Sequence, residues 1–293
     1  MPSDAVSYAD LVSCGVSRRR VRTMVLHRPW MSLRRSVYVE AGDVSVRRLL
    51  AAAEVAVRGR WVASHGTAAL MHGLVLLHPP RTDRLVLTVE STDSGHADLP
   101  GIHRHRAGLP RAHVTVVDGV PVTTRERTLV DLARALPPRD GLVAIDAAVH
   151  SGQASIAGLV AVVSDCRRWP YVRRARTLVE LADCACESPL ESLSRLFFVG
   201  HDIPMPRSQI TLMSRGSFLG RADFWWERQR VVGEADGLSK YTDASVLRAE
   251  KLRQERLENA GLRVVRWTWT DVDRPSEARR TAARLRRALD IAA

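Results

Sequence analysis

The sequence predicts a mixed α/β (α+β) protein built from three successive parts. Segments with the 3.6-residue periodicity of amphipathic helices alternate with short apolar segments bounded by turn residues, as strands are. The chain has 293 residues, of which 45% are hydrophobic and 26% charged, so it is long enough for two or three compact domains. We place the parts at residues 1–45, 46–178 and 179–293.

The first part predicts helix, turn, helix and a short hairpin. Gly15 ends a helix that starts near Tyr8, and Ser17 can cap the next helix, residues 17–28 (SRRRVRTMVLHR). Residues 29–39 alternate as the two strands of a small wing would. This order is typical of a winged helix-turn-helix, whose second helix lies in the DNA major groove. The alternative is an amphipathic helix with a solvated arginine face. The expected DNA-binding residues are Arg18, Arg19, Arg22, Arg34 and Arg35.

The middle part, residues 46–178, is predicted to be an α/β connector or interaction domain. We expect helices over 47–57, 64–71 and 125–135, a strand over 83–89, and a hairpin over 113–122. Asp118-Gly119 is the predicted hairpin turn, and Thr123 with Glu126 forms a predicted capping box for the third helix. Pro137-Pro138 is expected to stop that helix. The basic stretch 103–106 favours a solvated strand or loop over a phosphate contact, and we find no catalytic constellation here.

The last part predicts the order helix, strand, strand, strand, helix, strand, helix. Ser188 and Pro189 open the first helix as N-cap and first helical residue. The expected strands are 209–213, 218–226, 230–236 and 262–269, and the later helices cover 244–260 and the residues after Pro275. Gly261 is the expected C-cap of the longer helix.

Acidic residues gather where these strands end. Glu234 and Asp236 are alternate residues of one strand, so they share a face, and Asp223 lies in the preceding strand. Unpaired carboxylates are costly to desolvate, and a cation would neutralise them. Oxygen ligands suit Mg²⁺ or Mn²⁺, and such an ion can activate water beside a phosphate. The alternative is that Asp236-Gly237 is only a turn.

Lysine is rare in this chain, which has 42 arginines and only two lysines, Lys240 and Lys251. Both follow the acidic residues within 20 positions. A lysine ammonium can change its protonation state, whereas arginine stays charged. Lys240 could therefore handle a catalytic water, or it could be a surface charge paired with an acid.

The last part resembles the PD-(D/E)XK nuclease superfamily, closest to the branch related to very-short-patch-repair endonucleases. The matching pieces, over about 110 residues, are Glu191-Ser-x-x-Arg195, Arg221-Ala-Asp-Phe224, Glu234-Ala-Asp-Gly-Leu-Ser-Lys-Tyr241, Glu250-Lys-Leu-Arg253 and Arg263-Val-Val-Arg-Trp267. The resemblance implies a restriction-endonuclease-like three-layer domain in which Asp223 and Glu234 bind the metal. Asp236 stands where the superfamily usually has lysine, with Lys240 as a displaced substitute, which puts catalysis in doubt. Glu191 would be the first-helix acid, or only the partner of Ser188 in a capping box.

The first part resembles the winged-helix domain of AbiEi-type antitoxins. The matching stretch is GVSRRRVRTMV followed by W-x-x-L-R-R-x-V-Y-V, and residues 119–131 resemble a segment found downstream of that domain. This resemblance implies a regulator that binds DNA and pairs with a toxin protein.

The charge balance favours a polyanionic partner. The formal net charge is +12, which is typical of nucleic-acid-binding proteins and also of proteins that bind anionic membranes. We find no apolar run of the ~18 residues that cross a bilayer and no signal peptide, so we expect a cytoplasmic protein. Four cysteines indicate buried thiols; a metal at Cys184 and Cys186 is the alternative.

Two functions follow from these patterns. The preferred one is a DNA-binding protein that hydrolyses DNA phosphodiesters with Mg²⁺ or Mn²⁺ at Asp223, Glu234, Asp236, Lys240 and Glu191. The other is an AbiEi-like antitoxin or transcriptional regulator whose nuclease fold is inactive. RNA as substrate is a third alternative.

Overall fold

The computed structural model describes residues 5–26, 30–34, 37–40, 46, 49–50, 53–54, 57, 60–80, 84–89, 98–99, 101–214, 216–237 and 244–291. Within these ranges, some side chains, among them those of Arg18, Arg34 and Lys251, are also outside the description. Contacts divide the chain into two compact units. The N-terminal unit contains residues 1–136 and 154–176, and the C-terminal unit contains residues 137–153 and 177–293.

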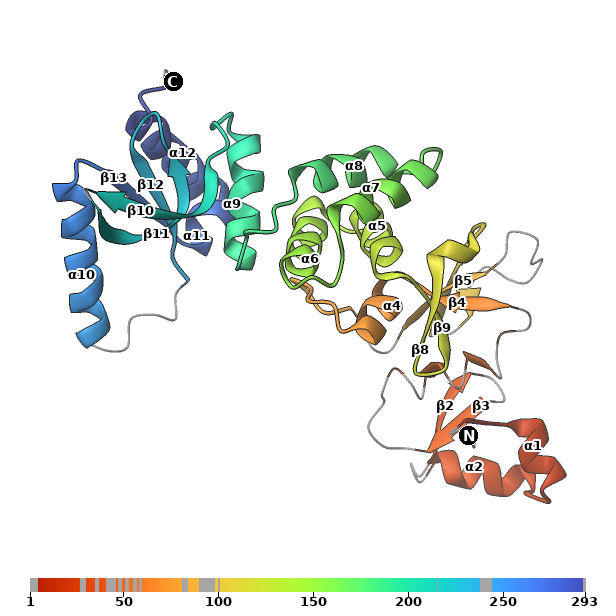
Figure 1. Cartoon of the computed structure of the whole chain (residues 1–293). Helices are drawn as coiled ribbons and strands as arrows, with labels where there is room; N and C mark the ends of the chain where they lie inside the picture. Colours follow the sequence, from red (N-terminus) through yellow and green to blue (C-terminus); the bar gives the residue numbers. More distant parts are fainter. Residues whose placement is uncertain are drawn as a thin grey trace. The chain divides into compact units, whose positions relative to one another are not determined.

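The N-terminal unit begins with two short helices and a three-stranded sheet (Figure 1). α1 (Tyr8–Ser13) and α2 (Arg18–Leu26) follow β1 (Ala5–Ser7), and the connection between them contains Gly15 at φ 79°. β3 (Val37–Glu40) is the central strand and pairs antiparallel with β1 and with β2 (Trp30–Arg34). The predicted helix–turn–helix and hairpin are therefore confirmed. β1 was not predicted, because three residues carry too little periodicity.

The same unit contains a mixed six-stranded sheet. Its strands, in spatial order, are β6 (Asp98–Leu99), β7 (Ile102–Arg106), β5 (Leu85–Val89), β4 (Trp61–Ala63), β9 (Val120–Thr123) and β8 (Val114–Val117). β8 and β9 form the predicted hairpin, and its turn residues Asp118 and Gly119 have φ of 51° and 82°. Positive φ at both positions is the geometry of the tight turn that joins twisted strands. The predicted helix over 47–57 lies largely outside the described residues.

Three helices of the N-terminal unit accompany this sheet. They are α4 (His65–His72), α5 (Arg125–Ala135) and α7 (Ile156–Asp165). The predicted cap of α5 is wrong by one residue: the Thr124 side chain accepts the hydrogen bond from the amide of Arg127. The hydroxyl of Thr123 instead hydrogen-bonds that of Thr128 at 2.7 Å. Thr123 is the last residue of β9, so its side chain stays with the sheet.

Three helices between residues 138 and 181 were not predicted. They are α6 (Pro138–His150), α7 and α8 (Val172–Leu181). Pro137-Pro138 ends α5 as predicted, but Pro138 also begins α6, because the first helical position needs no amide donor. α6 belongs to the C-terminal unit, although the residues on either side of it belong to the other.

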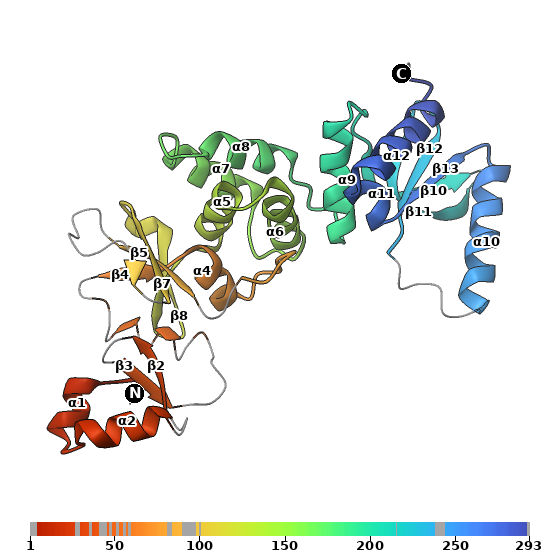
Figure 2. The ribbon, with the colours of Figure 1, turned by 180° about the vertical axis from the view of Figure 1, so that it is seen from behind.

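The C-terminal unit has three layers, with a four-stranded sheet between helices (Figures 1 and 2). Its elements follow the predicted order: α9 (Pro189–Gly200), β10 (Arg207–Ser214), β11 (Ser217–Trp226), β12 (Val231–Ala235), α10 (Ala244–Asn259), β13 (Arg263–Trp267), the short unpredicted α11 (Trp269–Asp273), and α12 (Pro275–Ala288). β10, β11 and β12 are antiparallel, whereas β12 and β13 are parallel with α10 as their crossover. Both views show α10 on one face and α9, α11 and α12 on the other.

Aromatic rings fill the face of this sheet that α9 covers. The Phe198 ring of α9 lies edge-on to the rings of Phe224, Trp226 and Trp267, with centroids 5.1, 5.3 and 5.7 Å away. At Gly233 a Cβ atom would lie 2.5 Å from the Trp267 ring, so only glycine lets that ring rest on β12. The mixed α/β class predicted from the sequence is confirmed.

The four cysteines are free thiols. Cys166 and Cys186 are buried, and burial raises the pKa of both; Cys14 and Cys184 are exposed. Buried thiols of raised pKa are poor nucleophiles and poor ligands. In the part of the chain that the structure describes, no helix combines the length and apolar character that a membrane crossing requires.

Candidate functional site

The second helix of the N-terminal part presents arginines to solvent. Val21 is buried against the rest of the motif, while Arg19 and Arg22 are exposed. Ser17 fixes the start of the helix by accepting a hydrogen bond from the amide of Arg20 at 3.3 Å. The predicted buried and exposed faces are confirmed at Val21, Arg19 and Arg22, whose side chains the structure describes. A solvent-facing basic face on such a helix is able to contact phosphates.

Several predicted site residues lie outside the described part of the chain. Arg35 and Lys240 are wholly outside it, as are the side chains of Arg18 and Arg34. Their roles stay predictions. Arg18 and Arg34 are placed by their backbones alone, at the first residue of α2 and the last residue of β2.

Asp223 and Glu234 occupy neighbouring positions on two antiparallel strands. Phe224 of β11 pairs with Gly233 of β12, and the two acids stand one residue further along each strand. The Asp223 carboxylate accepts a hydrogen bond from the amide of Ala235 at 2.8 Å. This contact joins β11 to the end of β12.

Glu234 is buried and faces helix α10. Its carboxylate pairs with the guanidinium of Arg253 at 2.7 Å, and the Glu234 side chain is only 7% exposed. Burial raises the pKa of Glu234 to about 7; Arg253 opposes that shift and Asp223 adds to it. Arg253 also donates to the carbonyl of Arg221 at 2.8 Å, so it holds both strands at this end.

Glu191 makes the contacts of a capping residue. Its amide donates to the Ser188 hydroxyl at 3.3 Å, and that hydroxyl donates to the Glu191 carboxylate at 2.7 Å. The amide of Glu187 donates to the other carboxylate oxygen at 3.1 Å. Only half of the predicted capping box is formed: the Ser188 side chain caps the amide of Glu191, but the Glu191 carboxylate accepts from the amide of Glu187 and not from that of Ser188. The Glu191 carboxylate also reaches the sheet, where it accepts a hydrogen bond from Gln209 of β10.

Gln209 links Glu191 to Asp223. Its side-chain amide donates to the Glu191 carboxylate at 2.9 Å and to that of Asp223 at 3.4 Å. All three side chains border a cavity of about 300 Å³, together with the ion pair of Glu187 and Arg221. Gln209 has φ of 53°, a left-handed value that is uncommon for residues other than glycine. With this backbone conformation, the side-chain amide of Gln209 lies between the carboxylates of Glu191 and Asp223.

Gln209 and Arg253 hold the carboxylates of Glu191, Asp223 and Glu234 in place. Neither of these two residues could be identified from the sequence. Gln209 is uncharged and belongs to no recognised motif. Nothing in the sequence indicates that its backbone is left-handed. Arg253 lies within a matching motif, but one arginine among 42 does not stand out. Asp236 follows the end of β12, where its amide donates to the carbonyl of Trp267 at 2.8 Å.

A model of a known protein family matches the middle of the chain. Residues 61–181 match the family model described as AbiEi antitoxin C-terminal domain. Two proteins of Mycobacterium tuberculosis, Rv2248 of strain H37Rv and MT2308 of strain CDC 1551, are each 30% identical to this chain over 249 residues. The alignment covers 83% of this chain and 86% of each relative, and both relatives are described as uncharacterized. The chain belongs to the family of these mycobacterial proteins.

The Rv2248 family shares far more than the antitoxin-like segment. The aligned 249 residues exceed the segment 61–181 that resembles the AbiEi antitoxin C-terminal domain. That segment begins with β4 and ends with α8. It therefore contains the whole hairpin and α5, and it contains none of the strand-end acids.

Proposed function

We propose that this chain is a DNA-binding regulator of the AbiEi antitoxin type. The observation that carries the proposal is the match of residues 61–181 to the AbiEi antitoxin C-terminal domain, in a chain whose N-terminal part contains a helix–turn–helix with exposed arginines. In this proposal α2 enters the major groove of an operator, and the antitoxin-like segment binds a toxin protein. The chain's formal net charge of +12 suits a DNA ligand. A neighbouring gene whose product arrests growth unless this chain is co-expressed would identify the toxin.

Alanine at Arg18, Arg19 and Arg22 is expected to weaken duplex DNA binding by roughly 1 kcal/mol for each arginine that touches a phosphate, about 100-fold in all. The physical reason is that each arginine–phosphate pair releases a counterion, so the salt dependence of binding should also become shallower, by about 0.9 in the logarithmic slope per pair. Fluorescence anisotropy with the full chain and a labelled duplex, at several salt concentrations, measures both quantities.

A charge-matched control separates a DNA-binding helix from general attraction. Arg228, Arg256 and Arg279 are exposed residues of the C-terminal unit, and their replacement by alanine removes the same total charge. We expect this control variant to bind within a few fold of the unchanged protein. Equal losses in the two variants, or no loss in either, would contradict the assignment of α2 as the DNA-binding helix.

A second candidate function is metal-dependent hydrolysis of DNA in the C-terminal unit. One observation supports it: Glu234 is buried beside Asp223 at the end of a strand. If an ion is bound, Asp223 and Glu234 would hold it, and the ion would stabilise charge on a phosphate. The fit is partial, because Arg253 already pairs with Glu234. Among the described residues, no group of three or more histidine, cysteine, aspartate or glutamate side chains could hold an ion together.

Plasmid cleavage tests this second function directly. With Mn²⁺ or Mg²⁺, the full chain is expected to nick plasmid DNA, and chelation is expected to stop it, because the ion stabilises the charged transition state. Asp223→Asn should abolish cleavage. Lys240→Arg should do the same if Lys240 handles the water, since a guanidinium does not release its proton. Cleavage that survives in Asp223→Asn, or that persists with chelator, would rule out this site and leave the regulator.

A further inference from the structure

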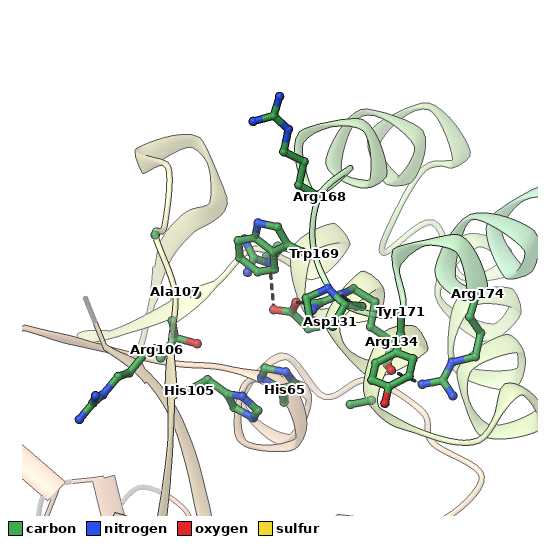
Figure 3. Close-up of a pocket in the computed structure, with 15 residues that line it drawn as sticks. His65, His105, Arg106, Ala107, Asp131, Arg134, Arg168, Trp169, Tyr171 and Arg174 are labelled. Carbon is green, nitrogen blue, oxygen red and sulfur yellow. Dashed lines mark hydrogen bonds and ion pairs between the residues drawn. The ribbon is translucent and has the colours of Figure 1, made fainter. Parts of the chain in front are cut away.

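The N-terminal unit contains a cavity for which neither candidate function names a ligand. It encloses about 680 Å³ and lies among α4, α5, the end of β7 and the segment that leads into α8 (Figure 3). Small-molecule sites in proteins measure about 300–1,000 Å³, so the cavity is large enough for a ligand of drug or nucleotide size. All of its lining residues belong to one unit and lie between residues 65 and 174.

Aromatic rings border the cavity on two sides. The imidazoles of His65 and His105 stack with centroids 4.1 Å apart and planes 15° from parallel. Figure 3 shows this pair at one end and the Trp169 indole nearer the other. Burial lowers the pKa of His65 to about 4, so its ring is neutral at physiological pH. A pair of stacked imidazoles and an indole suit a planar aromatic ligand.

Two aromatic residues of the lining have unusual backbones. His65 and Tyr171 have φ of 50° and 59°, in the left-handed region that bulky side chains rarely adopt. The Tyr171 side chain is nevertheless exposed, and Arg174 lies 5.1 Å from its ring centroid. Because the Tyr171 ring is exposed, its burial does not offset the cost of the strained backbone. Residues with strained backbones cluster at ligand-binding sites.

The charge of the lining is strongly positive. Five arginines face one aspartate: Arg106, Arg127, Arg134, Arg168 and Arg174 against Asp131. The Asp131 carboxylate is shared by Arg127 at 2.9 Å and Arg134 at 2.8 Å, so one negative charge serves two cations. Both guanidinium groups also lie over the Trp169 ring, at 4.2 and 4.9 Å from its centroid. An anionic ligand would balance this excess.

The rim of the cavity carries two exposed arginines. Arg106 follows the stacked histidines along β7, and Arg168 precedes Trp169. In Figure 3 both guanidinium groups point outward from the cavity, at separate places on its mouth. Long arginine side chains at a mouth can turn toward a charged group that enters it.

We propose that this cavity binds a nucleoside phosphate, with the base against the rings of Trp169 and His65 and the phosphates at the mouth, where Arg106 and Arg168 can turn toward them. A nucleotide combines the two properties that the lining selects, a flat aromatic ring and concentrated negative charge. The proposal does not depend on DNA binding by α2, since it rests on different residues.

Calorimetric titration of the full chain with ADP, GDP, CDP and UDP, each in turn at 0.15 M salt, tests the proposal. At least one of these diphosphates is expected to bind. Adenosine and pyrophosphate, which each offer half of the chemistry, should bind at least about 10-fold more weakly than a nucleotide, because each lacks one set of contacts. Trp169→Leu should weaken nucleotide binding by about 5- to 100-fold, the worth of one base–aromatic stack.

Charge reversal at the rim is expected to leave the fold intact, because both side chains are exposed. Arg106→Glu with Arg168→Glu changes only exposed side chains and should weaken nucleotide binding at least about 10-fold, the effect expected for one charge-assisted hydrogen bond. The matched control is Arg228→Glu with Arg279→Glu, two exposed arginines of the other unit, which should bind as before. Three results would overturn the proposal: no diphosphate binds at millimolar concentration, the rim variant binds as well as its control, or a single-stranded oligonucleotide competes for the cavity more tightly than any diphosphate.

Discussion

Replacing Asp131 with alanine is expected to destabilise the N-terminal unit by about 3–5 kcal/mol. The Asp131 side chain is fully buried, and Arg127, its partner at 2.9 Å, is only 1% exposed. Alanine would leave the Arg127 guanidinium buried without its counter-charge, which costs far more than the loss of one hydrogen bond. Arg127 would keep its contact with the Trp169 ring and its hydrogen bond to the imidazole of His113, which accepts at 3.0 Å and donates from its other nitrogen to Asp165. Neither ring supplies the negative charge of a carboxylate.

Hydrogen exchange of α5 measures this destabilisation locally, because Arg127, Asp131 and Arg134 all lie on that helix. Two controls define its cause. Arg127→Met with Asp131→Leu removes both charges and should recover much of the stability, since a buried pair can be replaced by apolar residues. Asp273→Ala breaks the exposed pair with Arg139 and should destabilise the C-terminal unit by less than about 1 kcal/mol, measured by hydrogen exchange of α6, which contains Arg139. A destabilisation of similar size in Asp131→Ala and Asp273→Ala would mean that burial of the charge is unimportant.

Replacing Phe198 with alanine is expected to destabilise the C-terminal unit by about 3–5 kcal/mol. Phe198 is completely buried and its ring meets three others, of Phe224, Trp226 and Trp267. The destabilisation combines the transfer of the ring to water with the cavity that remains, and large rigid aromatic neighbours cannot collapse into that cavity. Gly233 offers no side chain that could fill it.

Phe218 supplies the matched control, because it is 57% exposed on β11. Phe218→Ala is expected to change the stability by no more than about 0.5 kcal/mol, the usual range for surface positions. Hydrogen exchange of α9 in both variants reports the difference. Equal protection of α9 in the two variants would show that the aromatic cluster contributes little to this unit.

The sequence predicts most elements of the fold wherever a local signal exists. In the C-terminal unit, the caps at Ser188 and Gly261 and the apolar strands fix the order from α9 to α12. Helices α6, α7 and α8 were not predicted. For α6 the reason is that Pro137-Pro138 was interpreted only as the end of α5, whereas Pro138 is also the first residue of α6. The edge strand β6 has two residues, which is too short for any periodicity.

The candidate sites were less accessible to sequence reasoning, because their decisive partners are distant in the chain. Asp223 and Glu234 were identified by type and spacing, whereas Gln209 and Arg253 act through tertiary contacts alone. Residue type gives no warning that an arginine will pair with a predicted metal ligand. The large cavity was missed altogether, since the residues that line it come from helices, a strand end and a loop up to about a hundred positions apart.

The chain passes between its two units three times, at residues 136/137, 153/154 and 176/177. The consequence is that no single cut of the polypeptide, and no single truncation of its gene, separates two complete folding units. A fragment that begins at residue 177 lacks α6, and one that stops at residue 136 lacks α7 and the lining residues Trp169 and Tyr171. The segment that resembles the antitoxin domain, 61–181, spans all three passages. The segment that matches the antitoxin family model and the segments that fold as one unit therefore do not coincide.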